Sequence, residues 1–202
     1  MKKIKIAVLI SGGGTNLQAL LDAQKSGVIK SGEITLVISN KAGVYGLERA
    51  KTAGVKSLVI TKKECGGTDE FNDKLLEVLK EHGIEMVVLA GFLAILSKKF
   101  TDTFKDRIIN VHPSLIPSFC GVGYYGLKVH EEALKYGVKV TGATVHYVNE
   151  IADGGKIIMQ KAVEILDGDT PEILQRRVME QAEWIILPNS TELVCKKLIN
   201  EK

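Results

Sequence analysis

The sequence has no apolar stretch long enough to cross a membrane and no large excess of charge of either sign. Its first apolar run, residues 4–10, is followed by glycines and by no small-residue cleavage site, so we interpret it as a strand rather than a signal peptide. The net charge is +3, and the lysines are scattered without the aromatic-basic clusters of nucleic-acid modules. We therefore expect no membrane partner and no nucleic-acid partner.

Cysteine is also scarce. The three cysteines, Cys65, Cys120 and Cys195, are odd in number and lie far apart, so they fit neither a disulfide framework nor a zinc ribbon. A reducing, cytoplasmic setting is the simplest expectation. Cys120 has no evident partner to orient it as a nucleophile, which argues against a thiol hydrolase.

What the chain does contain is an alternation of strand and helix patterns over 202 residues, which predicts one domain, 1–202, of the α/β class. The regular alternation predicts a doubly wound, mainly parallel sheet, with an antiparallel C-terminal portion. The expected strands are residues 4–10, 34–39, 57–60, 85–90, 107–111, 139–148 and 156–165.

Two helices can be delimited from their ends. Thr68 is the expected cap of a helix that Gly83 stops, and its apolar stripe comprises Phe71, Leu75, Val78 and Leu79. The last helix should begin after a cap at Asp169 or Thr170, with Pro171 in its first turn. Pro188 should break or kink that helix. Between residues 120 and 130 we expect a glycine- and tyrosine-rich loop.

A glycine loop follows the first strand in "AVLISGGGTNLQALL" and leads into a helix, an arrangement that exposes backbone N–H groups to an anion. Leu17 stands where a dinucleotide fingerprint needs glycine, and "GTN" replaces the G-K-[ST] of a Walker loop. The remaining interpretation is a monophosphate cradle built from Gly13, Gly14, Thr15 and Asn16. The alternative is a glycine turn that only allows close helix packing.

Two polar side chains end a later strand in "IINVHPSLIP". Because side chains alternate along a strand, Asn110 and His112 point to the same side, and Pro113 ends the strand just beyond them. The carboxyl edge of an α/β sheet is where ligands bind. An amide and a protonated imidazole both donate hydrogen bonds, so the pair could stabilise the oxyanion formed when a nucleophile adds to a carbonyl.

Such a histidine needs a carboxylate to hold its charge, and the candidate is Asp153 in "NEIADGGKII". Spacing alone leaves open whether Asp153 is instead a turn residue. His112 has no second histidine or cysteine at a metal-ligand spacing, so no metal is expected.

The segments "ISGGGTNLQ", "VVLAGFLAIL", "INVHPSLIPSF", "GATVHYV" and "DGGKIIMQ" together resemble the phosphoribosylglycinamide formyltransferase family. The resemblance implies a Rossmann-like formyltransferase fold, with a phosphate-binding N-terminal half and a folate-binding, catalytic C-terminal half. It implies transfer of a formyl group from 10-formyltetrahydrofolate to the amine of 5'-phosphoribosylglycinamide in purine biosynthesis. Asn110, His112 and Asp153 match the family's catalytic residues.

The resemblance also implies how the two small molecules bind. Gly13, Gly14, Thr15 and Asn16 match the phosphate-binding positions, and Pro113 and Glu183 match further positions at the ribonucleotide. The folate-binding positions correspond to Leu93, Ala94, Ile95, Leu96, Asn110, Ile151 and Ala152. Ala94 and Trp184 depart from residues common in the family, arginine and histidine respectively. The sequence is compatible with a monomer or a homodimer.

The remaining histidines and three rival functions complete the expectations. His82 and His146 are interpreted as structural, and His130 matches a family histidine near the substrate. The main alternative is a 10-formyltetrahydrofolate hydrolase, disfavoured because the chain begins directly at the first strand without a regulatory domain. Formylation of initiator tRNA would need a further basic domain. A non-catalytic nucleotide-binding module would use Asn110 and His112 only to satisfy buried hydrogen bonds.

Overall fold

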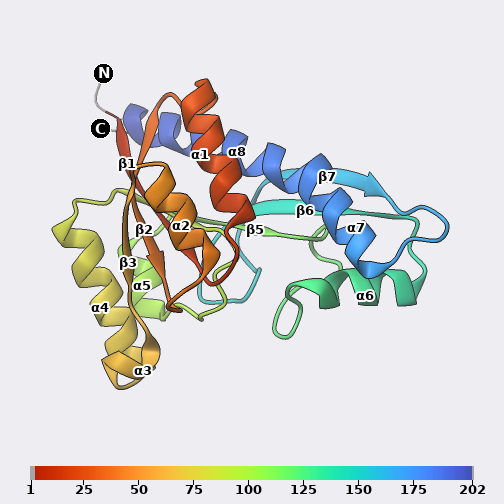
Figure 1. Ribbon diagram of the computed structural model, residues 1–202, viewed down its shortest axis with the longest axis horizontal. Coiled ribbons are helices and arrows are strands. Elements are labelled where there is room, and N and C mark those ends of the chain that lie inside the picture. Colours follow the sequence, from red (N-terminus) through yellow and green to blue (C-terminus); the bar gives the residue numbers. More distant parts are fainter. Residues whose placement is uncertain (1–2, 202) are drawn as a thin grey trace.

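The computed structural model describes residues 3–201 and contains one seven-stranded sheet with the strand order β3-β2-β1-β4-β5-β6-β7 (Figure 1). The strands are β1 (Ile4–Ile10), β2 (Gly32–Ser39), β3 (Lys56–Val59), β4 (Met86–Leu89), β5 (Ile108–His112), β6 (Val140–Tyr147) and β7 (Ile157–Glu164). All seven coincide with the predicted strands to within one residue at each end, except that β2 begins two residues early.

The pairing of the strands confirms the predicted fold class. The first five strands form a parallel sheet, whereas β6 runs antiparallel to β5 and β7 antiparallel to β6. The chain proceeds outward from β1 to β3 and then returns to place β4 on the other side of β1. The strand order therefore reverses between β1 and β4, and ligands of open α/β sheets bind at the carboxyl ends of the strands beside such a reversal.

Helices cover both faces of the sheet (Figure 1). The helical elements are α1 (Thr15–Ser26), α2 (Tyr45–Thr52), α3 (Lys62–Cys65), α4 (Thr68–Glu81), α5 (Lys98–Thr103), α6 (Leu127–Tyr136), α7 (Pro171–Val178), the π-helical turn η1 (Met179–Glu183) and α8 (Trp184–Asn200). One buried cluster contains side chains of α1, α7 and α8, and the other contains those of α4 and α5. Alternation along β1 supplies both clusters, with Val8 in the first and Leu9 in the second.

The helix ends differ from the sequence predictions at two places. Helix α4 has the predicted stripe, but its cap is Gly67, so Thr68 is the first helical residue rather than the cap. Helix α6 begins at Leu127, inside the loop predicted for residues 120–130, and continues to Tyr136 through residues for which no element was predicted. The glycine loop ends at Gly126, after which Val129 and Ala133 fall on one buried face and Gly137 provides a left-handed stop.

Near the C-terminus, Thr170 caps α7 and accepts a hydrogen bond from the Ile173 N–H, which resolves the choice between Asp169 and Thr170. Of the two predicted effects of Pro188, a break in the last helix is wrong, because α8 continues through it, and a kink stays a prediction. The regular α-helical pattern is instead interrupted before α8, in the π turn η1, where the wider turn shifts the residues of α8 relative to the pattern of α7. Within residues 3–201, no helix is long and apolar enough to span a bilayer.

Candidate active site

Asn110 and His112 lie at the carboxyl end of β5, on one side of the sheet, as the alternation predicted. Asn110 is half-buried, whereas His112 is only 4% exposed. Pro113, also half-buried, follows β5 immediately and begins the loop that leads to α6. The neighbouring Val111 belongs to the core on the opposite face. The β5 edge therefore presents one partly accessible amide beside one buried imidazole.

Asp153 lies on the β6–β7 connection, and the structure brings it to the end of β5. Its Oδ2 atom is 3.5 Å from His112 Nδ1 and accepts a hydrogen bond of 2.8 Å from the Gly121 N–H. The residue has a φ of 54°, a left-handed conformation that costs energy for a side chain other than glycine. Strain of this kind, at a residue whose carboxylate is aimed at an imidazole, is typical of a functional site.

The charge state of His112 reflects two opposing effects. Burial lowers the pKa of its imidazole, and the Asp153 carboxylate and the Phe119 carbonyl, which both raise it, offset only part of that effect. The sequence predicted a net increase from Asp153, and the net direction is the reverse because His112 is almost fully enclosed. His112 is therefore neutral in the free protein at pH 7 and has a carboxylate ready to stabilise a proton that arrives during a reaction.

The loop between β5 and α6 covers His112 from the other side. His112 Nε2 lies 2.8 Å from the Phe119 carbonyl oxygen, and because a carbonyl only accepts hydrogen bonds, Nε2 carries the hydrogen of the neutral ring in this arrangement. A substrate atom can reach Nε2 only where this carbonyl gives way. On the same loop, Phe119 packs against Tyr124 and Tyr136 with ring centroids 6.5 and 6.0 Å away. The loop is thus held by aromatic contacts as well as by the Gly121 bond to Asp153.

The glycine loop after β1 is shaped by α2. Gly14 has a φ of 71°, and a Cβ atom there would lie 2.8 Å from the Gly46 Cα. The Gly46 N–H donates to the Gly12 carbonyl, and Arg49 Nε donates to the Gly13 carbonyl at 2.9 Å. In a trans peptide the next N–H points opposite to the carbonyl. Helix α2 therefore turns the N–H groups of Gly13 and Gly14 away from itself, toward a ligand.

The first turn of α1 is joined to the π turn by a buried polar contact. Asn16 Nδ2 donates to Glu183 Oε2 at 2.6 Å, and the carboxylate is only 6% exposed. Burial raises the pKa of Glu183 to about 7, although the bond from Asn16 acts in the opposite direction. Among the described residues, Asn16 Oδ1 has no partner. Thr15 Oγ1 lies 3.8 Å from Met179 Sδ of the same turn. These groups leave hydrogen-bonding capacity for a polar ligand.

The predicted folate-binding residues are divided between surface and core. Leu93 and Ile95 are 53% and 76% exposed on the β4–α5 connection, whereas Leu96 is buried and Ala94 packs against the core. Across from them Ile151 is 63% exposed, and Ala152 is exposed beside it. The two segments are linked by the ion pair of Lys98 with Glu150 at 3.3 Å. Exposed apolar side chains concentrated in this way are typical of a binding surface.

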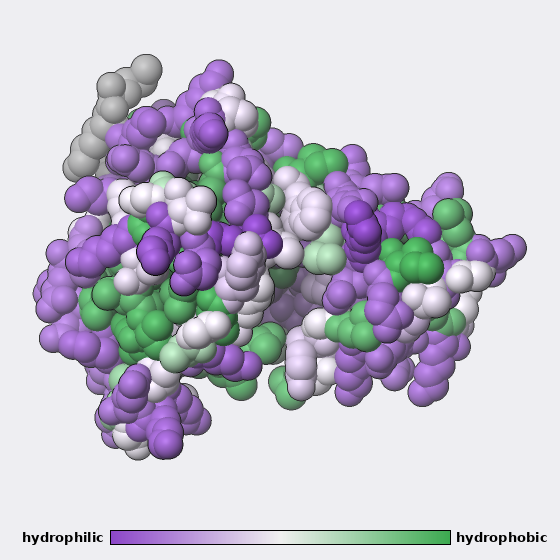
Figure 2. Space-filling model, in the orientation of Figure 1, coloured by the Kyte–Doolittle hydropathy of each residue, from purple (hydrophilic) through white to green (hydrophobic). Residues whose placement is uncertain are grey.

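These features share one edge of the sheet. The glycine loop follows β1, the apolar connection follows β4, and Asn110 and His112 end β5. Because β1, β4 and β5 are adjacent parallel strands, their carboxyl ends place these three groups side by side. The Leu93 N–H donates to Ser11 Oγ at 2.9 Å and joins the second segment to the first. Figure 2 shows a hollow between the surface formed by α1 and α2 and that formed by α6 and α7.

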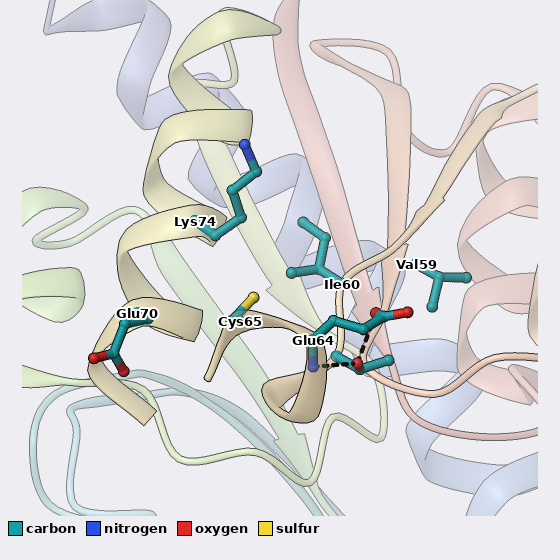
Figure 3. Close-up of a pocket in the computed structure, with 7 residues that line it drawn as sticks. Val59, Ile60, Glu64, Cys65, Glu70 and Lys74 are labelled. Atoms are coloured by element: carbon teal, nitrogen blue, oxygen red, sulfur yellow. Dashed lines mark hydrogen bonds between the residues drawn. The ribbon is translucent and has the colours of Figure 1, made fainter. Parts of the chain in front are cut away.

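A separate pocket of about 410 Å³ lies between the end of β3, α3 and α4 (Figure 3). In the close-up, Glu64 and Cys65 come from α3, and Glu70 and Lys74 project from α4. Three of its polar side chains already have partners, because Thr61 caps α3 and bonds Glu64, and Lys74 pairs with Glu77 at 2.6 Å. None of the predicted site residues lines this pocket, so we do not place the chemistry there.

Sequence reasoning missed three residues of the site. Gly46 and Arg49 hold the glycine loop, and His146 lies on β6 opposite Asn110. The strand pairing of β5 with β6 could have revealed His146, because an antiparallel neighbour must supply a side chain opposite each polar residue. The α2 contacts depend on the packing of a helix against a loop, which carries no periodic signal.

The fold and the site together define an α/β scaffold that places a glycine loop and a cluster of Asn110, His112 and Asp153 on one sheet edge. Residues 4–190 match the family model described as "Formyl transferase". The chain belongs to the formyl transferase family.

Individual relatives are similar along most of the chain. The phosphoribosylglycinamide formyltransferase of Haemophilus influenzae is 44% identical over 91% of this chain and 84% of its own length. The trifunctional purine biosynthetic protein adenosine-3 of Gallus gallus is 47% identical over 95% of this chain, which spans only 18% of that longer protein. The crystal structure of glycinamide ribonucleotide transformylase 1 from Symbiobacterium toebii has a TM-score of 0.90 at 42% identity, covering 96% of this chain and 89% of that one.

Proposed function

We propose that this chain transfers the formyl group of 10-formyltetrahydrofolate to the amine of 5'-phosphoribosylglycinamide, as a step of purine biosynthesis. The observation that carries the proposal is the pairing, on one sheet edge, of an anion cradle after β1 with Asn110, His112 and Asp153 after β5. The names of the relatives from Haemophilus influenzae and Symbiobacterium toebii support the same reaction.

In the proposed reaction the amine nitrogen attacks the formyl carbon directly, and no covalent enzyme intermediate forms. The carbonyl electrons move to the oxygen, where the Asn110 amide donates a hydrogen bond to the developing charge. Once the Phe119 carbonyl has moved away and the ring hydrogen lies on Nδ1 toward Asp153, neutral His112 accepts at Nε2 the proton that the amine loses, and Asp153 stabilises the resulting imidazolium. The carbonyl then re-forms, the bond to N10 of the folate breaks, and His112 returns the proton to N10.

The substrates would bind on either side of this centre. The N–H groups of Gly13 and Gly14, with those that begin α1 at Thr15 and Asn16, suit the phosphate of the ribonucleotide. Glu183 would accept hydrogen bonds from the ribose hydroxyls, and Pro113 would bound the path to the amine. The pterin of the folate would lie against the apolar segment Leu93–Leu96 and against Ile151 and Ala152.

A direct test measures tetrahydrofolate formation by absorbance, with and without the ribonucleotide. Turnover that requires the ribonucleotide is the expected result. Turnover with water alone would identify a 10-formyltetrahydrofolate hydrolase, and binding of both compounds without turnover would identify a binding module. Either of these two results would contradict the proposal.

Glu183 provides a prediction about stability and pH. The folded-state pKa of about 7 lies above the ordinary value of 4.5, so the neutral carboxyl favours the fold below pH 4.5. This contribution is lost as pH rises from 4.5 through 7, at a cost on the order of 3 kcal/mol. In Glu183→Gln, the gain in unfolding free energy over the wild type should therefore grow between pH 5 and 8, while KM for the ribonucleotide rises. Denaturant unfolding at both pH values checks this, and a gain that does not vary with pH would contradict it.

A further inference from the structure

His146 lies between two of the residues to which the reaction is assigned. The antiparallel register places it on β6 directly opposite Asn110 of β5. Its Nε2 atom is 3.2 Å from Asn110 Nδ2 and 3.5 Å from Asp153 Oδ1. The ring is only 2% exposed, so water does not compete for these contacts. His146 is thus well placed to control how its two neighbours are oriented.

The other ring nitrogen determines what Nε2 can do. His146 Nδ1 lies 2.8 Å from the carbonyl oxygen of Tyr147. A carbonyl only accepts hydrogen bonds, so Nδ1 must carry a proton. In the neutral ring Nε2 then has a free lone pair and can only accept. The Asn110 amide must therefore direct its nitrogen, rather than its oxygen, toward His146.

We propose that His146 is a positioning residue that fixes the orientation of the Asn110 amide for formyl transfer. An amide nitrogen has two hydrogens, and when one is bonded to His146 Nε2 the other is directed to the open side of Asn110. This inference rests on the proposed function, because that second hydrogen is the one assigned to the developing oxyanion. Without the ring, the amide could rotate and present its own oxygen to that oxyanion, which would repel it.

Three polar groups contact the ring, namely the Asn110 amide, the Asp153 carboxylate and the Tyr147 carbonyl. The His112 imidazole also lies close enough to interact with it electrostatically. A charged ring would instead donate from Nε2 to Asp153 Oδ1 and would no longer accept from the amide. The 3.2 Å approach of Asn110, shorter than the 3.5 Å approach of Asp153, favours the neutral arrangement.

The ring can be observed without any assay of activity. Nuclear magnetic resonance of protein labelled with ¹⁵N-histidine distinguishes protonated from unprotonated ring nitrogens, and the His146 signals are assigned as those missing from a His146→Gln sample. At pH 7 we expect a protonated Nδ1 and an unprotonated Nε2. A protonated Nε2 would overturn the inference, and this measurement does not depend on whether His146→Leu folds.

Kinetics then test the link to Asn110. His146→Gln keeps an oxygen that can accept near the Nε2 position, and kcat should stay within about fivefold of the wild type. His146→Leu has no acceptor, and kcat should fall about 30-fold, less than the 10²- to 10³-fold loss for a whole oxyanion donor. KM should change little, because the lost interaction belongs to the transition state.

A double-mutant cycle separates action through Asn110 from a general effect on packing. In an Asn110→Ala background, His146→Leu should lower kcat by less than about threefold more, because its target is already absent. Full, additive losses in the double variant would overturn the inference while leaving the proposed function intact. An inactive wild-type protein would instead reject the proposed function.

Discussion

Replacing His112 with asparagine should lower kcat for formyl transfer by about 10³-fold, the range expected when a general acid–base group is lost. Asparagine can donate a hydrogen bond but cannot take the amine's proton and return it to N10. Stopped assays at saturating levels of both substrates measure this change. Binding of the ribonucleotide should be little affected, because the phosphate site that we propose follows β1 rather than β5.

His82 offers a matched control for this substitution. It closes α4, where its Nδ1 lies 2.9 Å from the Val78 carbonyl oxygen, and it has no contact with the site. His82→Asn should therefore leave kcat unchanged, whatever small stability it costs. If His112→Asn retained more than about a tenth of the wild-type kcat, His112 could not be the proton acceptor in the reaction.

Substituting Gly14 with alanine should raise KM for the ribonucleotide by about 10²-fold or more. The new Cβ would lie 2.8 Å from the Gly46 backbone, at a residue whose φ of 71° alanine rarely adopts. The glycine loop must therefore move, and the N–H groups of Gly13 and Gly14 then no longer point toward the phosphate. A loss of two charge-assisted hydrogen bonds, each worth about 1.5 to 3 kcal/mol, accounts for an effect of this size. Initial rates over a range of ribonucleotide concentrations check it.

A Gly27→Ala variant serves as a control that distinguishes the effect of backbone strain from the effect of losing the proposed phosphate site. Gly27 has a φ of 79° at the other end of α1, and a Cβ atom there would contact only the flexible Lys30 side chain, at 3.9 Å. Gly27→Ala should cost about 1 kcal/mol of unfolding free energy and leave KM unchanged. An equal rise of KM in both variants would mean that the effect of Gly14→Ala is global destabilisation rather than loss of the anion cradle.

Much of the fold follows from local patterns in the chain. The strands could be located because buried parallel strands are continuous apolar runs, and β5 stood out through the two polar residues at its end. Helix α6 could not be found in this way, because its amphipathic pattern is short and follows a run of glycines and tyrosines. The passage of α8 through Pro188 depends on a π turn, which has no signal in the sequence.

The candidate site was predictable in its residue types but not in its electrostatics. Alternation placed Asn110 and His112 together, whereas the proximity of Asp153 came from family resemblance and not from spacing. The lowered pKa of His112 and the raised pKa of Glu183 both arise mainly from burial. Burial depends on how other segments fold over a side chain, as the loop that carries Phe119 does over His112, and a single sequence does not reveal how completely they cover it.

The fate of a labelled formyl group tests the central claim most directly. The wild-type protein would be incubated with 10-formyltetrahydrofolate carrying ¹³C in the formyl group, together with 5'-phosphoribosylglycinamide, and the products followed by carbon resonance. Direct transfer predicts that the label appears as an amide on the ribonucleotide in step with tetrahydrofolate. Label that accumulates as free formate, with the ribonucleotide unmodified, would contradict the account.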